Sequence, residues 1–217
     1  MKRGNYLLLL LFAALCCNLQ AADKVNQKAS KYLKILEKRP KPGYLFDKFY
    51  SSWMENSTLD KLRTHLEKKS EKSSSYILLL AFLNEKEGEY SEALLYYRKA
   101  LKKNDQSAAL FYYKGKLEAL LLNFDKAGKD LEKALTLKLS GRVKEKAQLL
   151  LARVYIRQQQ PKKALVLWDK LLKDKHSSEE LQEDIVEAQI EEGHFQEALK
   201  SCDLLSSKIS DKYKLVL

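Results

Sequence analysis

Hydrophobic residues recur at helical spacing through the middle of the chain, and the same spacing returns several times. Ala93 is followed by Tyr97 and Ala100, so apolar side chains occupy positions i, i+4 and i+7 on one face of a helix. The pattern returns at Ala127, Leu131 and Ala134, at Ala164, Trp168 and Leu171, and at Ala198, Cys202 and Leu205. Successive alanines are 34, 37 and 34 residues apart. Self-similarity at this period predicts an array of helical repeats.

Each of these helices follows a second apolar segment with a compact residue at its centre. That residue stands twelve positions before the corresponding alanine in all four copies, at Ala81, Gly115, Ala152 and Val186. Two helices with facing small residues can pack backbone close to backbone. The turns between them are predicted at Gly88, Asn123, Gln159 to Pro161, and Gly193. The sequence therefore predicts four antiparallel helix pairs.

At these residues the chain resembles the tetratricopeptide repeat (TPR) family, whose unit is a 34-residue helix-turn-helix. The resemblance implies an all-α fold, a right-handed α-solenoid of antiparallel helix pairs. The array spans residues 73–217, with repeats at 74–107, 108–141, 145–178 and 179–212. Lys114 departs from the pattern because the family usually has an apolar residue there. The three extra residues before the third copy fall in "LKLSGRV", where we expect a longer loop.

An aromatic segment precedes the first clear repeat. Phe46, Phe49, Tyr50 and Trp53 lie at helical spacing, followed by Leu59, Leu62 and Leu66. We interpret residues 43–72 as a degenerate leading helix pair whose aromatic side chains form core and cover the apolar end of the array. Residues 23–42 are expected to form a partly helical segment followed by a linker.

The first 22 residues have the features of a secretory signal peptide. Lys2 and Arg3 precede the apolar run "YLLLLLFAALCC", and small residues follow, so cleavage is expected after Ala21 or Ala22. Twelve apolar residues are too few for a transmembrane helix, which needs ~20. Lipidation of Cys16 or Cys17 is the alternative, but Leu15 and Cys16 are bulkier than the residues that usually precede a lipidated cysteine. We therefore expect export by a cleaved signal and no transmembrane segment in the mature chain.

The composition and net charge of the chain indicate which classes of molecule it could bind. The chain has 217 residues, 45% of them hydrophobic, and a formal net charge of +11. Such a charge attracts acidic proteins, anionic lipid or nucleic acid, and export makes nucleic acid an unexpected partner. Removal of the signal peptide leaves Cys202 as the one remaining cysteine, which precludes an intrachain disulfide. Its place among apolar repeat positions predicts a small buried side chain.

Motifs of enzyme chemistry are absent from the sequence. His65, His176 and His194 stand far apart, without an HExxH motif or a His/Cys cluster, and are interpreted as surface residues. There is no GxSxG, no phosphate-binding glycine loop and no CxxC. We therefore expect no catalytic residues, no metal site and no cofactor.

In the TPR family the first helices of successive repeats line a concave groove, so helical geometry selects candidate binding residues. The resemblance implies a groove that is apolar at its start, then aromatic and basic, then acidic. The candidate groove residues are Phe82, Tyr112, Lys116, Lys146, Arg153, Arg157, Glu183 and Glu187. Such a charge gradient would orient an extended peptide or a partner helix. The alternative is that these side chains form solvated helix faces.

These features predict an exported, non-catalytic scaffold that binds a protein or peptide in the periplasm or cell envelope. Bacterial origin is an inference from the form of the signal peptide. Two alternatives remain open: an N-terminal adaptor region of a longer protein that carries an effector or enzyme domain, or a module that self-associates into a larger envelope complex. Leu215, Val216 and Leu217 follow the last repeat without a polar cap, which favours a continuation of the chain.

Overall fold

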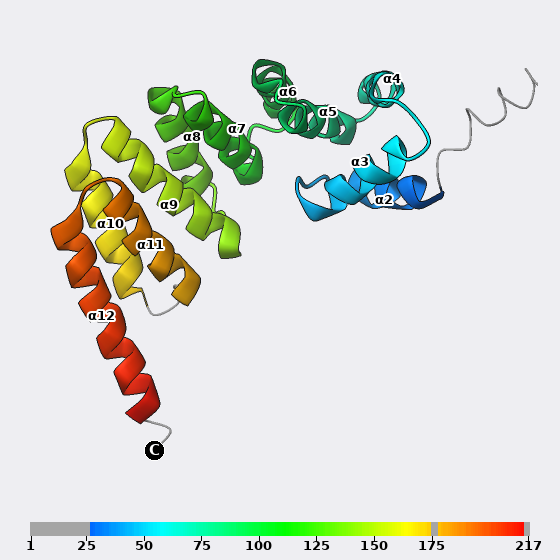
Figure 1. Cartoon of the computed structure of the whole chain (residues 1–217). Helices are drawn as coiled ribbons and strands as arrows, with labels where there is room; N and C mark the ends of the chain where they lie inside the picture. Colours follow the sequence, from blue (N-terminus) through cyan, green and yellow to red (C-terminus); the bar gives the residue numbers. More distant parts are fainter. Residues whose placement is uncertain (1–26, 175–177, 215–217) are drawn as a thin grey trace, which may run out of the picture. The chain divides into compact units, whose positions relative to one another are not determined.

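The computed structural model describes residues 27–174 and 178–214, and these residues form eleven α-helices and no strand (Figure 1). The predicted signal peptide at 1–22, His176 and the last three residues lie outside the described part of the chain. Within that part, no helix combines the length and the apolar composition that crossing a membrane requires.

The chain divides into two compact units, Met1–Lys103 and Asn104–Leu217. The helices of the first unit are α2 (Gln27–Lys38), α3 (Tyr44–Met54), α4 (Leu59–Ser70), α5 (Ser74–Lys86) and α6 (Tyr90–Lys103). Those of the second are α7 (Ala108–Leu120), α8 (Phe124–Thr136), α9 (Gly141–Arg157), α10 (Pro161–Lys173), α11 (Glu179–Glu191) and α12 (Phe195–Lys214).

The aromatic segment forms the core of the first unit, as predicted. Phe46, Phe49 and Trp53 on α3 are buried. The Phe46 ring lies edge-on to Phe82 of α5, with ring centroids 5.7 Å apart. Helix α3 packs against α2, and α4 packs against α5. Residues 27–38, which were expected to be partly helical, thus supply a helix that covers the leading segment.

Small residues hold the helix pairs together at the predicted positions. Ala81, Ala93, Ala127, Ala152 and Ala164 are fully buried. Gly115 on α7 is also buried, and a Cβ added there would lie 3.0 Å from the Leu131 side chain and 3.3 Å from the Ala127 carbonyl oxygen of α8. A larger residue at position 115 would therefore force these two helices apart.

The turns inside the four pairs share one left-handed residue at equivalent positions. These residues, with φ between 60° and 80°, are Gly88, Leu122, Gln159 and Gly193. Asn123 lies in the second turn, between α7 and α8, as predicted, but the left-handed residue of that turn is Leu122. Asn123 directly precedes α8, and its side-chain amide donates a hydrogen bond to Glu118. Pro161 is the first residue of α10, as predicted.

The three extra residues of the third repeat lengthen a helix rather than a loop. Helix α9 has 17 residues, whereas α7 and α11 have 13 each. The connection from α8 to α9 contains Lys138, which has a positive φ, and Gly141, with φ 57°, begins α9. The expectation of a longer loop is therefore wrong, because an added helical turn satisfies its own backbone hydrogen bonds.

Cys202 is exposed, which contradicts the prediction that it is buried. Its neighbour Ser201 is buried instead and donates a hydrogen bond to the Gln189 side chain of α11, 2.9 Å away. Equivalent residues such as Leu131 and Trp168 are covered from both sides. Helix α12 packs against α11, and Leu204 of α12 also packs against the core cluster that contains Trp168.

Candidate protein-binding site

Seven of the eight predicted groove residues lie on first helices of the second unit. Helix α7 packs beside α9, and α9 packs beside α11. We call the surface formed by their selected residues the first-helix face: Tyr112, Lys116, Lys146, Arg153, Arg157, Glu183 and Glu187. Lys116, Lys146, Arg157, Glu183 and Glu187 are exposed, whereas Tyr112 and Arg153 are half-buried.

Phe82 does not belong to this face, contrary to the prediction. It lies in the first unit and is only 2% exposed. Its ring packs against Phe46 of α3 and Tyr97 of α6, with centroids 5.7 and 6.3 Å away. Helical periodicity predicted an exposed position for Phe82. The structure differs because α3, which is more than thirty residues away in sequence, buries this side chain.

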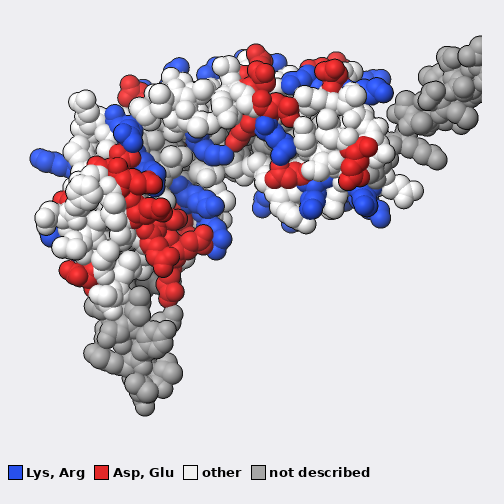
Figure 2. Space-filling view, in the orientation of Figure 1, with Lys and Arg blue, Asp and Glu red and all other residues white. Residues whose placement is uncertain are grey.

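Ion pairs connect the basic residues of α9 with the acidic residues of α11. Arg153 Nη1 lies 2.8 Å from a carboxylate oxygen of Glu191, and Arg157 Nη2 lies 3.1 Å from one of Glu192. Figure 2 shows a band of Asp and Glu side chains over α11, with Lys and Arg side chains beside it. The predicted basic and acidic zones therefore neutralise one another in part.

A third ion pair extends this contact to the start of the two helices. Arg142 Nη2 lies 3.0 Å from a Glu180 carboxylate oxygen. Exposed ion pairs of this kind contribute little to stability, about 0–1 kcal/mol each. They do fix which charges stand next to each other across α9 and α11.

Some charges of the first-helix face remain uncompensated. Within the described residues, neither Glu183 nor Glu187 forms an ion pair or a side-chain hydrogen bond. They lie one helical turn apart on α11. A carboxylate that is exposed and unpaired keeps its attraction for a cationic partner, so these two residues are the accessible acidic part of the face.

The hollows beside this face differ in size. One of about 370 Å³ is lined by Leu122 to Lys126 together with Arg157 and Gln158. The Gln158 side-chain amide donates to the Phe124 carbonyl, 3.0 Å away, and thereby ties α9 to the preceding turn. The other, lined by Arg142, Lys146 and neighbouring residues, has a volume of only about 10 Å³.

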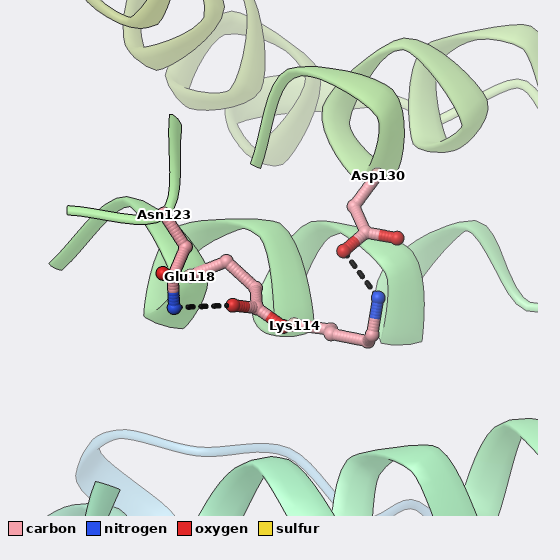
Figure 3. Close-up of polar contacts among 4 residues, drawn as sticks. All are labelled: Lys114, Glu118, Asn123 and Asp130. Carbon is pink, nitrogen blue, oxygen red and sulfur yellow. Dashed lines mark hydrogen bonds and ion pairs between the residues drawn. The ribbon is translucent and has the colours of Figure 1, made fainter. Parts of the chain in front are cut away.

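A buried polar cluster inside the α7–α8 pair was not predicted from the sequence (Figure 3). Lys114 forms an ion pair with Asp130, and both side chains are largely buried, at 16% and 10% exposed. The fully buried Glu118 accepts a hydrogen bond of 2.9 Å from Asn123. The sequence did carry a signal, since Lys114 stands at an apolar repeat position and needs a partner there.

The two described histidines are half-buried, so their interpretation as surface residues is wrong. His65 packs against Trp53, with ring centroids 5.2 Å apart, and His194 packs against Trp168 at 6.1 Å. Burial lowers the pKa of His65, and nearby Lys69 lowers it further, while Glu37 opposes the change. Among the described residues, no three His, Cys, Asp or Glu side chains are grouped so that they could hold a metal ion.

Comparison with known proteins identifies the fold. No protein-family model and no curated protein matches the sequence. Among solved structures, YrrB, described as a TPR protein with an unusual peptide-binding site, is 23% identical, with 67% of this chain and 73% of YrrB covered and a TM-score of 0.50. MamA is 19% identical over 77% of this chain and 93% of its own, with a TM-score of 0.55.

A tetratricopeptide repeat protein from Parabacteroides merdae is 17% identical over 85% of this chain and 68% of its own, with a TM-score of 0.58. The likeness agrees with the helix pairs, the buried small residues and the repeated left-handed turn residue. The protein therefore has the tetratricopeptide repeat fold, an all-α, right-handed α-solenoid of antiparallel helix pairs.

Proposed function

We propose that this protein is an exported, non-catalytic protein-interaction scaffold that binds a peptide or a partner helix on its first-helix face. The TPR fold supports this class of function, as does the likeness to YrrB, which is described as having a peptide-binding site. The proposal of export to a periplasm or cell envelope rests on the sequence of residues 1–22.

The observation that carries the proposal is the juxtaposition of a basic and an acidic helix on one accessible surface. Lys146 on α9 is exposed without an ion pair among the described residues, and so are Glu183 and Glu187 on α11. A partner that crosses from α9 to α11 would therefore meet positive and then negative charge. Such an arrangement favours one orientation of the partner, because the reversed orientation places like charges together.

A peptide library displayed on phage and selected against the purified chain tests this proposal. The informative variant is Glu183→Lys/Glu187→Lys, because these exposed side chains form no ion pair within the described residues, so their reversal breaks none there. Reversal of Arg153 and Arg157 is less suitable, since it would place like charges against Glu191 and Glu192. The matched control is Asp105→Lys/Asp203→Lys, which changes the net charge equally at two exposed sites away from the face.

Peptides enriched by the wild type and by the control, but not by Glu183→Lys/Glu187→Lys, would support the first-helix face as the binding site. Peptides retained equally by all three proteins would contradict it. A library that yields no enrichment with wild type would contradict peptide binding as the function.

A second candidate function is self-association through α12. Phe195 and Leu199 lie one turn apart and are 66% and 63% exposed, which is unusual for large apolar side chains. Light scattering over a range of concentrations should show a mass that rises in the wild type and stays constant in Phe195→Asp/Leu199→Asp. A monomer mass at all concentrations would exclude this candidate.

A further inference from the structure

A second surface, distinct from the first-helix face, lies between α9 and α10. It is an open groove of about 430 Å³ lined by Leu151, Tyr155, Lys162, Lys163, Val166, Leu167 and Lys170. This volume falls within the ~300–1,000 Å³ range of binding pockets. Apolar side chains form the floor of the groove. Among them, Leu151 is buried, whereas Val166 is 70% exposed.

The rim of this groove carries three lysines from α10. Among the described residues, none of Lys162, Lys163 and Lys170 forms an ion pair. Lys163 lies over the Tyr155 ring, 5.3 Å from its centroid. The neighbouring Lys173, by contrast, pairs with Asp169 at 2.8 Å. The apolar floor is thus bordered by positive charge that no carboxylate of the described chain compensates through an ion pair.

Tyr155 is held at the wall of the groove by a contact with the preceding repeat. Its hydroxyl donates a hydrogen bond of 2.9 Å to Glu132 of α8. Burial, together with this carboxylate, raises the pKa of Tyr155 to about 12, so the hydroxyl remains a donor at neutral pH. The ring also packs against the core around Leu131 and Leu151. The groove wall is therefore preorganised rather than dependent on a ligand.

We propose that this groove binds an acidic amphipathic helix of a partner protein, with apolar side chains in the groove and carboxylates against the three lysines. Lys163 and Lys170 are seven residues apart, or ~10 Å along α10. Carboxylates two turns apart on a partner helix have the same separation. Apolar side chains one turn apart between them would cover Val166 and Leu167.

The test uses a fluorescein-labelled peptide of about 15 residues, a length at which an isolated helix becomes marginally stable. It presents leucines one turn apart, flanked by Asp and Glu, and fluorescence anisotropy measures its binding to the purified chain. A second peptide carries Asn and Gln in place of the acids. The wild type should bind the acidic peptide at least about tenfold more tightly than the neutral one.

Two variants locate the binding. Lys162→Glu/Lys163→Glu/Lys170→Glu and the single change Val166→Asp should each weaken the acidic peptide by about tenfold or more. The matched control, Lys129→Glu/Lys144→Glu/Lys200→Glu, reverses three exposed lysines outside the groove and should leave the affinity unchanged. Thermal melts of all variants verify that they remain folded.

Equal affinity for the two peptides, or equal weakening by groove and control variants, would overturn the proposal. A second result would also overturn it: the wild type binds vesicles of phosphatidylglycerol, the groove variants do not, and the acidic peptide binds neither. The lysines would then bind a membrane surface. The Glu183→Lys/Glu187→Lys variant should bind the acidic peptide with the affinity of the wild type. This result would distinguish the groove from the first-helix face.

Discussion

The side chains of Lys114 and Asp130 form a buried ion pair that joins α7 to α8. The repeat pattern would place an apolar residue at position 114, and the ion pair explains how a lysine is accommodated there. The contact lies beside Gly115, where the two helices approach closely. The stability of this helix pair therefore depends on an electrostatic contact as well as on apolar packing.

Asp130→Ala should destabilise the protein by ~3 kcal/mol or more, because it leaves the Lys114 ammonium group buried without its partner. The double variant Lys114→Leu/Asp130→Ala should recover most of that loss, because no buried charge remains. Free energies of unfolding from urea titrations measure both changes. Equal losses in the single and double variants would show that the charge of Lys114 is not the cause.

Ala127→Arg should unfold or strongly destabilise the α7–α8 pair, by ~3 kcal/mol or more, because it forces a charged side chain into a fully buried position. Lys129→Arg, on the exposed side of the same helix, is the control and should have little effect. Thermal melts followed by circular dichroism provide the measurement. An unchanged melt for Ala127→Arg would contradict the close packing of the repeat.

The first unit should lose stability as the pH falls through the histidine range. The pKa of His65 is lowered in the folded state, so the unfolded chain takes up the proton first. The stabilisation is therefore present above the ordinary histidine pKa of ~6.5 and is lost as the pH falls through the lower folded pKa. The residues that face the ring are Trp53, Tyr76, Glu37 and Lys69.

Melting temperatures at neutral and mildly acidic pH test this prediction. The decrease on acidification should be smaller in His65→Phe, which keeps an aromatic ring against Trp53 and cannot be protonated. An identical decrease in wild type and variant would assign the pH dependence to other groups.

Export with cleavage of the signal, as proposed, should yield a product that begins near Ala22 or Asp23, because cleavage is expected after the small residues that follow the apolar run. Amino-terminal sequencing of protein recovered from the medium or the envelope determines the first residue. Met1 on the exported protein would contradict a cleaved signal, and an acylated Cys16 or Cys17 would assign the protein to the lipoproteins.

Local periodicity predicted the helices and most of their buried small residues, because both depend on neighbours within one helix pair. Ala81 and Ala93, or Ala152 and Ala164, are close in sequence and pack as their spacing implies. Glycine marks two of the four left-handed turn residues correctly. Leu122 escaped prediction because the surrounding turn imposes a conformation that leucine seldom adopts.

Contacts between repeats could not be derived in the same way. Phe82 became core because α3 covers it, and Arg153 and Arg157 meet carboxylates more than thirty residues away. Cys202 is exposed and its neighbour Ser201 is buried, because the packing of α12 against α11 decides which side chains of α12 are covered. In each case the outcome depends on which helix lies alongside, and helical periodicity carries no information about that neighbour.

A charge-swap titration tests the central claim, binding on the first-helix face, most directly. A peptide selected by the wild type is titrated calorimetrically against wild type and Glu183→Lys/Glu187→Lys, and its basic residues are then replaced by glutamate. The original peptide should bind the variant about tenfold or more weakly, and the glutamate peptide should regain affinity for the variant alone. If both peptides bind both proteins equally, the partner does not contact Glu183 and Glu187, and the first-helix face is not the binding site.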